Sequence, residues 1–311
     1  MGFALSANAD SGFIDFERNW LFPDTLSGMK YQTVEKYNED TLGYSIFYYD
    51  RETTFKAEVS VCNLGYDPIP DGFESKPINL VLKGVGSELD RRQKSRAIKR
   101  LKKRGSAVVP KEGNLRFASV VYEYVESDSS AKSMIRSIYI TGIQNCFIKI
   151  DLTFDKKFGA NAKEREKEML SQMAQMVSTT PDEKELLLAS CSVFLKDPSS
   201  YGGRLSARYL ISKAQEMGNL NVYSNFFVWP TGYYSKPKNS ELLIAGYFAG
   251  MLQVVVPQNL DEGGEYEAFL AMLKTYETLH KNEQIKSIEE FDEWLTAPDK
   301  KVLFEKLLKT E

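Results

Sequence analysis

Residues 54–64 read Thr-Phe-Lys-Ala-Glu-Val-Ser-Val-Cys-Asn-Leu, and this stretch decides the fold of the N-terminal half of the chain. Apolar and polar side chains alternate along it: Phe55, Ala57, Val59 and Val61 fall on one side, and Lys56, Glu58 and Ser60 fall on the other. Alternation with a period of two is the pattern of a strand with one buried face. We therefore predict a half-buried strand here and a sheet built outward from it.

The sequence on both sides of this strand predicts further strands. They cover residues 31–37, 43–49, 114–125, 134–143 and 146–154. All but one of the links between consecutive strands are short, and residues 142–145 form a tight turn. Because a short link can join only antiparallel neighbours, we expect a largely antiparallel sheet.

Two segments of this half have helical spacing. Residues 77–104 place Pro77 in a first turn and repeat apolar residues every three or four positions, and Gly105 ends the run. Residues 160–178 form the second amphipathic segment. The predicted order is β-β-β-α-β-β-β-α. This order indicates an α+β fold in which a largely antiparallel sheet packs with two helices.

The pattern changes after residue 178. Thr180-Pro-Asp-Glu183 reads as a capping box that opens a helix over residues 183–195. Further helices are predicted at 205–217, 241–255, 266–280, 288–295 and 300–309, with one possible strand at 222–229. We therefore divide the chain into a signal remnant and flexible segment (1–19), an α+β domain (20–178) and a mainly α-helical domain (179–311).

The first residues and the cysteines bear on the compartment. Ala7-Asn8-Ala9 resembles the cleavage site of a secretory signal, which favours a periplasmic or secreted protein. The alternative is a cytoplasmic protein in which the pattern is a coincidence. Cys62, Cys146 and Cys191 are widely spaced and odd in number, which allows at most one disulfide and one free thiol, and we interpret them as buried free thiols.

Composition excludes several chemistries. The chain has 311 residues, 42% of them hydrophobic, a net charge of −3 and a single histidine. A zinc site built on several imidazoles is therefore impossible, and His280 reads as a solvated residue at a helix end. The glycines of Lys83–Ser87 fit a helix better than a phosphate loop. We predict no catalytic residue, metal, cofactor or membrane span.

A basic run is the sharpest local feature. Residues 91–104 carry nine positive charges in fourteen positions. The candidate contacts to an anionic surface are Arg91, Arg92, Lys94, Arg96, Lys99 and Arg100. Three interpretations stay open: a solvated helix end, an anionic-surface contact or a nucleic-acid contact. The run lacks aromatic residues for base stacking, and residues 1–178 hold 26 basic and 24 acidic groups, which does not favour nucleic acid.

An aromatic cluster is the second candidate site. Residues 226–234 contain Trp229, Tyr233 and Tyr234, which could line a groove for a peptide or a glycan. The alternative is a strand whose rings pack on the helices, followed by a loop. Nearby, Gly246 and Gly250 permit a close approach of two helices, which we interpret as packing inside the domain.

The N-terminal half also resembles known proteins. Residues 21–28 (LFPDTLSG), 42–44 (LGY) and 147–154 (FIKIDLTF) resemble a group of uncharacterised, usually exported bacterial proteins. The order of strands and helices over about residues 20–178 is similar to the PsbP-like α-β-α sandwich. That group includes a subunit of the oxygen-evolving complex and a nuclear-transport regulator of Ran. The resemblance implies a binding module and carries over no catalytic residue.

These observations predict a non-enzymatic binding or assembly module of the bacterial cell envelope, whose partner is a protein or an envelope component. One alternative is a hydrolase that uses carboxylates in a cleft between the two domains. The other is a binder of anionic surfaces or nucleic acid through a basic helix at residues 91–104.

Overall fold

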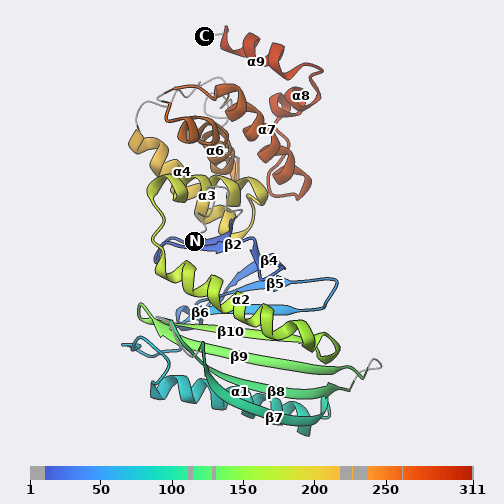
Figure 1. Cartoon of the computed structure of the whole chain (residues 1–311). Coiled ribbons are helices and arrows are strands. Elements are labelled where there is room, and N and C mark those ends of the chain that lie inside the picture. Colours follow the sequence, from blue (N-terminus) through green and yellow to red (C-terminus); the bar gives the residue numbers. More distant parts are fainter. Residues whose placement is uncertain are drawn as a thin grey trace. The chain divides into compact units, whose positions relative to one another are not determined.

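A computed structural model describes residues 11–110, 115–127, 131–217, 226, 237–260 and 262–309 (Figure 1). The chain divides into two compact units, each described separately below. One unit is formed by residues 23–180 and is called the α+β unit. The other is formed by residues 1–22 and 181–311 and is called the helical unit.

The α+β unit is built on one eight-stranded sheet with the order β3-β4-β5-β6-β10-β9-β8-β7. Its strands are β3 (Thr25–Leu26), β4 (Met29–Lys36), β5 (Tyr44–Tyr49), β6 (Lys56–Cys62), β7 (Ile98–Val109), β8 (Phe117–Glu126), β9 (Ser133–Ile143) and β10 (Cys146–Asp155). Every neighbouring pair is antiparallel. The predicted α+β class with its antiparallel sheet is confirmed.

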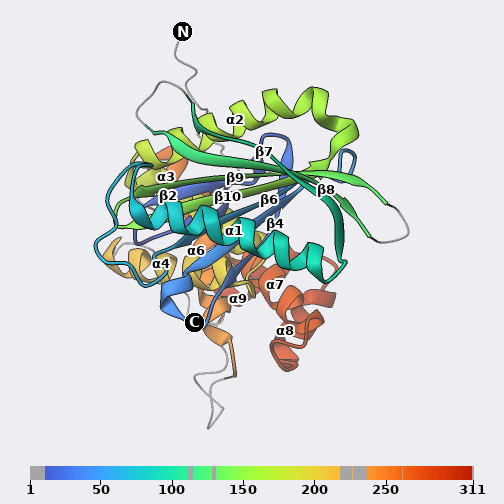
Figure 2. The same cartoon turned by 90° about the horizontal axis from the view of Figure 1, so that it is seen from below.

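Helices α1 (Lys76–Lys94) and α2 (Gly159–Ser178) lie on opposite faces of this sheet (Figures 1 and 2). On β9, Ile138 and Ile140 belong to apolar clusters with α1. The intervening Ser137 donates a hydrogen bond to Glu166 on α2. Because successive side chains of a strand point to opposite faces, the two helices cover opposite sides. Short 3₁₀ turns occupy Asp40–Leu42 and Lys156–Phe158.

The structure corrects the prediction of one long helix over residues 77–104. Helix α1 ends at Lys94, and residues 98–109 form the edge strand β7. The register of β7 on β8 shifts between Lys99 and Lys102 and again between Lys103 and Gly105. Because of these irregularities, apolar and polar residues of β7 do not alternate with a period of two. The first half of β7 holds only two apolar residues, and these are spaced three positions apart, as in a helix. The basic helix 91–104 therefore does not exist as one element.

The helical unit contains α3 (Glu183–Lys196), α4 (Tyr201–Met217), α6 (Ser240–Gln258), α7 (Glu265–Lys281), α8 (Glu289–Thr296) and α9 (Lys300–Leu308). The capping box of α3 is formed by Asp182 and Glu185, two residues later than the predicted pair Thr180 and Glu183. The predicted helices of this region are all present, with ends that differ by a few residues.

Residues 11–19, expected to be flexible, are ordered in this unit. They contribute β1 (Ser11–Asp15), which pairs with β2 (Trp20–Pro23) in a two-stranded sheet. Every residue of β1 is buried. Ile14 packs against the α3 residues Leu186 and Val193, so the segment completes the apolar surface of that helix.

Helix α6 lies at the centre of the helical unit. We predict no membrane span from the sequence, but this helix has the length and hydropathy of one. However, 67% of its apolar window is buried inside the unit. A helix that is apolar all round is also what a surrounded core helix requires. A Cβ added at Gly250 would lie 2.5 Å from the carbonyl oxygen of Glu267 on α7, and one at Gly246 would lie 2.5 Å from Thr275 Oγ1. The predicted intradomain role of both glycines is confirmed.

Candidate functional site

The sheet face on the α1 side has two different halves. Helix α1 covers one half with apolar contacts, in which Val85 and Leu89 pack with Val120 and Ile138. The other half carries polar side chains of β5, β6 and β10 and forms a depression of about 640 Å³ beside α1. We call this depression the sheet groove. Its lining residues are Gln32, Phe47, Tyr48, Tyr49, Lys56, Ala57, Glu58, Glu88, Arg92, Tyr124, Arg136, Asp151 and Thr153.

Arg136 on β9 organises the floor of the sheet groove. Its Nη2 lies 2.6 Å from Asp151 Oδ2 on the neighbouring strand β10, and its Nη1 lies 3.2 Å from Glu88 Oε2 on α1. The Arg136 and Asp151 side chains are only 13% and 8% exposed, respectively. Burial alone would lower the pKa of Arg136, but hydrogen bonding to Asp151 and the two carboxylate charges raise it. The guanidinium is therefore a permanent, fixed cation that links α1 to the sheet.

Glu58 on β6 is held by hydroxyl groups. The hydroxyls of Ser45 and Ser60 donate to Glu58 Oε1 at 2.8 and 3.1 Å. The phenol of Tyr37 donates in turn to Ser45 Oγ at 3.1 Å. Ser45 and Ser60 are themselves buried, so this cluster satisfies polar groups that the sheet has removed from water.

Two other cations of the sheet groove lie over tyrosine rings. Lys56 Nζ is 5.7 Å from the ring centroid of Tyr49, and Arg92 Cζ is 5.7 Å from that of Tyr124. Neither cation forms an ion pair with any residue that the structure describes. A cation over a ring face is oriented without losing its charge. Both donors are therefore positioned and available in the groove.

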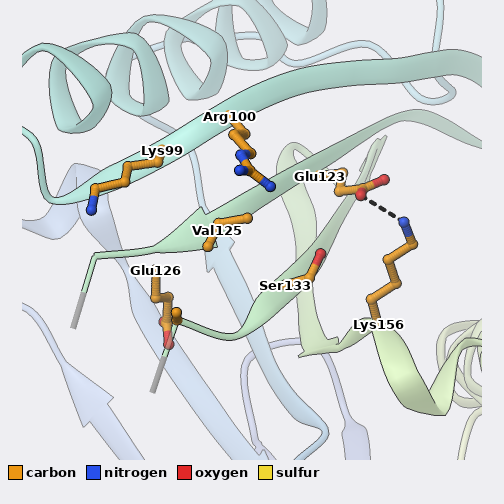
Figure 3. Close-up of a pocket in the computed structure, with 8 residues that line it drawn as sticks. Lys99, Arg100, Glu123, Val125, Glu126, Ser133 and Lys156 are labelled. Atoms are coloured by element: carbon orange, nitrogen blue, oxygen red, sulfur yellow. Dashed lines mark hydrogen bonds and ion pairs between the residues drawn. The ribbon is translucent and has the colours of Figure 1, made fainter. Parts of the chain in front are cut away.

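A second depression lies at the end of strands β7 and β8 and has a volume of about 540 Å³ (Figure 3). We call it the edge hollow, and it is lined by Lys99, Arg100, Glu123, Val125, Glu126, Ala131, Ser133 and Lys156. Lys156 Nζ lies 2.7 Å from Glu123 Oε1, and Arg104 pairs with the same carboxylate. Glu123 is thus already engaged by two cations.

The structure separates the six predicted basic contacts. Arg92 lies in the sheet groove, and Lys99 and Arg100 line the edge hollow. Arg91, Lys94 and Arg96 are exposed and line neither depression. The six residues do not form one site.

The position of β7 gives the basic run a structural role. Within the described part of the chain, β7 pairs with β8 alone and is an edge of the sheet. Exposed lysines and β-bulges are two devices that prevent an edge strand from pairing with another molecule. At the C-terminus of α1, Arg91, Arg92 and Lys94 also interact favourably with the helix dipole. Contact with an anionic surface stays a prediction.

The predicted aromatic cluster at residues 226–234 is described only at Phe226. Trp229, Tyr233 and Tyr234 lie outside the described residues, whereas Phe226 is buried among Tyr247, Phe269 and Phe304.

The thiols and the histidine also behave as the sequence predicts. All three cysteines are free and buried, and burial raises the pKa of the Cys62 thiol to about 11, so it stays protonated at neutral pH. His280 is exposed in the last turn of α7. Residues 83–87 are helical, and Gly86 lets α1 approach Tyr122.

Sequence reasoning missed the sheet groove. Alternation in residues 54–64 correctly places Lys56, Glu58 and Ser60 on one face, but it reads that face as plain solvent exposure. The signal that could have been used is an arginine within an otherwise apolar strand, Arg136, together with Asp151 in the next strand. Only the register, which pairs Asp151 with Ile138 and Thr153 with Arg136, shows that these two charges meet.

No family model matches this chain, and no curated protein matches it. Among solved structures, it is similar to cyanobacterial PsbP (CyanoP) from Synechocystis sp. PCC 6803, with 12% identity, 55% of this chain and 95% of that chain covered, and a TM-score of 0.35. It is also similar to the Ran-binding protein Mog1p of Saccharomyces cerevisiae, with 13% identity, 54% and 83% coverage and a TM-score of 0.24. The expected resemblance to PsbP is thus present as a weak structural similarity.

Proposed function

We propose that this protein is a binding or assembly module of the bacterial cell envelope and that the sheet groove is where its α+β unit holds a partner. The observation that carries the proposal is the groove itself. A polar half of a sheet face is left uncovered, yet its charged side chains are held in place by one another. Concave sites with convergent, fixed polar groups are the usual form of binding sites.

The chemistry of the groove supports binding. Arg136 bridges the carboxylates of Asp151 and Glu88, and hydrogen bonds hold the Glu58 carboxylate. Phe47 and Tyr49 add half-buried ring surface beside these charges. A ligand therefore meets a pre-ordered surface with both apolar and polar contacts, which lowers the entropic cost of association.

The test is a groove-filling substitution. Thr153 is half-buried on the groove floor between Lys56 and Arg136, so Thr153→Trp should occupy the space that the partner needs. Ser106→Trp, at an exposed position on β7, is the matched control. Each variant is immobilised, and the proteins retained from envelope and cytosolic fractions of the source cell are quantified by mass spectrometry.

We expect wild type and Ser106→Trp to retain the same envelope component and Thr153→Trp to lose it. Equal retention by all three proteins would contradict a role for the groove. Groove-dependent retention from the cytosolic fraction alone would contradict the envelope location. A melting curve of Thr153→Trp that matches wild type shows that the loss does not come from unfolding. If Thr153→Trp does not fold, Lys56→Gln, which changes an exposed side chain, replaces it.

A further inference from the structure

The shape of the sheet groove limits what it can hold. Its lining residues come from six adjacent strands, from Gln32 on β4 to Tyr124 on β8, and end at Arg92 on α1. Six strands span five inter-strand spacings, or roughly 24 Å. An extended peptide rises about 3.3 Å per residue, so a segment of about seven residues fits this length.

Two cations of the groove have no ion-pair partner among the described residues, whereas each of its carboxylates is bound by a cation or by hydroxyl groups. Among its carboxylates, Asp151 and Glu88 are bound to Arg136, and Glu58 accepts bonds from two serines. Of the groove's three cations, Lys56 and Arg92 have no ion-pair partner in the described part of the chain. Donors that lie free beside engaged acceptors are complementary to an anionic ligand.

The spacing of the two cations defines the ligand further. Lys56 lies on β6, and Arg92 lies over Tyr124 on β8, which is three inter-strand spacings away and two residues further along the register. This separation is roughly 16 Å. Two acidic residues four positions apart in an extended peptide are separated by about 13 Å at their Cα atoms, and their side chains and those of the two cations span the remaining few ångströms.

The carboxylates of the groove argue against a nucleic acid. Glu58, Glu88 and Asp151 lie between or beside the two cations and would repel the closely spaced phosphates of a polynucleotide. A peptide carries separate charges and can place neutral residues over these carboxylates. It can also place apolar side chains on the rings of Phe47 and Tyr49.

From this arrangement we propose that the sheet groove binds an extended acidic peptide segment of a partner protein, with two carboxylates four residues apart bound by Lys56 and Arg92. The proposal rests on the proposed binding function of the groove and names the chemistry of its ligand.

The test is a titration of the full-length, ¹⁵N-labelled protein with synthetic peptides, followed by NMR. The probe is acetyl-Gly-Ser-Asp-Val-Ser-Val-Asp-Ser-Gly-amide. One comparison peptide has lysine in place of both aspartates, and another places the two aspartates side by side. Sodium phosphate is the small-anion comparison. The variants are Lys56→Gln and Arg92→Gln, and Arg91→Gln is the matched control because this neighbouring, exposed arginine does not line the groove.

We expect the probe to shift amide signals of β5, β6 and β10 and to bind more tightly than every comparison ligand. Loss of one charge-assisted hydrogen bond should weaken it about tenfold in Lys56→Gln and in Arg92→Gln. Arg91→Gln should bind as wild type does.

Three results would overturn this proposal: no binding of the probe, equal binding of the lysine peptide or of phosphate, or an equal loss in Arg91→Gln. The last would show that the basic run acts as a general electrostatic surface. If the probe fails while retention of a cellular partner still depends on Thr153, the groove has another ligand and the proposed function stands. If neither depends on the groove, both proposals fail.

Discussion

The two faces of strands β6 and β10 differ in chemistry, although neighbouring residues of the same strands form them. Toward α2, Val59, Ile150 and Leu152 are fully buried and apolar. Toward α1, Glu58, Asp151 and Thr153 are polar and form the floor of the sheet groove. One face supplies the apolar burial that stabilises the unit. The other supplies a shaped, charged surface whose order comes from ion pairs and hydrogen bonds. A polar strand face can thus be a built site as well as a solvated one.

The largest effect should come from the apolar face. Ile150 is completely buried, and Ile150→Ala removes three carbon atoms from a packed layer. We expect a loss of about 4 kcal/mol in the free energy of unfolding of the α+β unit. The measurement is hydrogen exchange of β10 amides in increasing urea, which reads this unit separately from the helical unit. Thr153→Ala on the same strand should change it by less than about 0.5 kcal/mol, and an equal loss would mean that the two faces are not distinct.

The next effect tests the groove face. Arg136→Met leaves the buried Asp151 carboxylate without its cation, which we expect to cost about 3 kcal/mol in the same exchange experiment. Adding Asp151→Leu removes the uncompensated charge and should restore most of that loss. If the double variant is as unstable as the single one, Arg136 contributes through packing, and the charge pair is not what orders the groove.

The smallest effect on the free energy of unfolding should come from a second ion pair, on the α2 side of the sheet. Arg165 of α2 lies 2.8 Å from Asp50 Oδ2. Burial of Asp50 acts to raise its pKa, but hydrogen bonds from Thr53, Arg165 and the Glu52 amide outweigh it, and the pKa is lower than usual. A carboxyl whose pKa is lowered by folding stabilises the protein above its unfolded pKa of about 3.9 and loses this contribution as the pH falls through the folded value.

Asp50→Asn should therefore destabilise the α+β unit by about 1 kcal/mol at pH 7 and by progressively less below pH 4. Unfolding measured in urea at several pH values checks this. A difference between the two proteins that stays constant down to pH 2 would show that Asp50 acts through shape and not through its charge.

These comparisons also show which features the sequence can predict. Regular alternation identifies β6 and β10, and helical spacing with capping signals identifies α2, α3, α4, α6, α7, α8 and α9 with small errors at the ends. Strand β7 is missed because its stability comes from pairing with β8, which overrides the low strand propensity of its lysines. Its two bulges also remove the period of two. The groove is missed because Arg136 and Asp151 meet through register, and a sequence without pairing information does not fix register.

Strands β1 and β2 are missed for another reason. Ser11–Asp15 is short and follows the Ala7-Asn8-Ala9 pattern. That pattern resembles a signal cleavage site and favours a flexible segment over a strand at these residues. The apolar residues Phe13 and Ile14 on this segment are the signal that it folds, since both are buried in the helical unit. Local composition was sufficient here, whereas the groove required tertiary information.

Helix α6 has a consequence for how the chain is made. During synthesis it emerges as a 19-residue apolar segment before α7, its closest packing partner, exists. In that interval it has the length and hydropathy that membrane-insertion machinery recognises. Helix α7 begins at Glu265, only seven residues after α6 ends at Gln258, so its partner follows at once. The short connection and the two glycines allow α6 and α7 to pack as a helical hairpin as soon as α7 has been synthesised. Folding of the nascent chain thereby competes with insertion of α6 into a membrane.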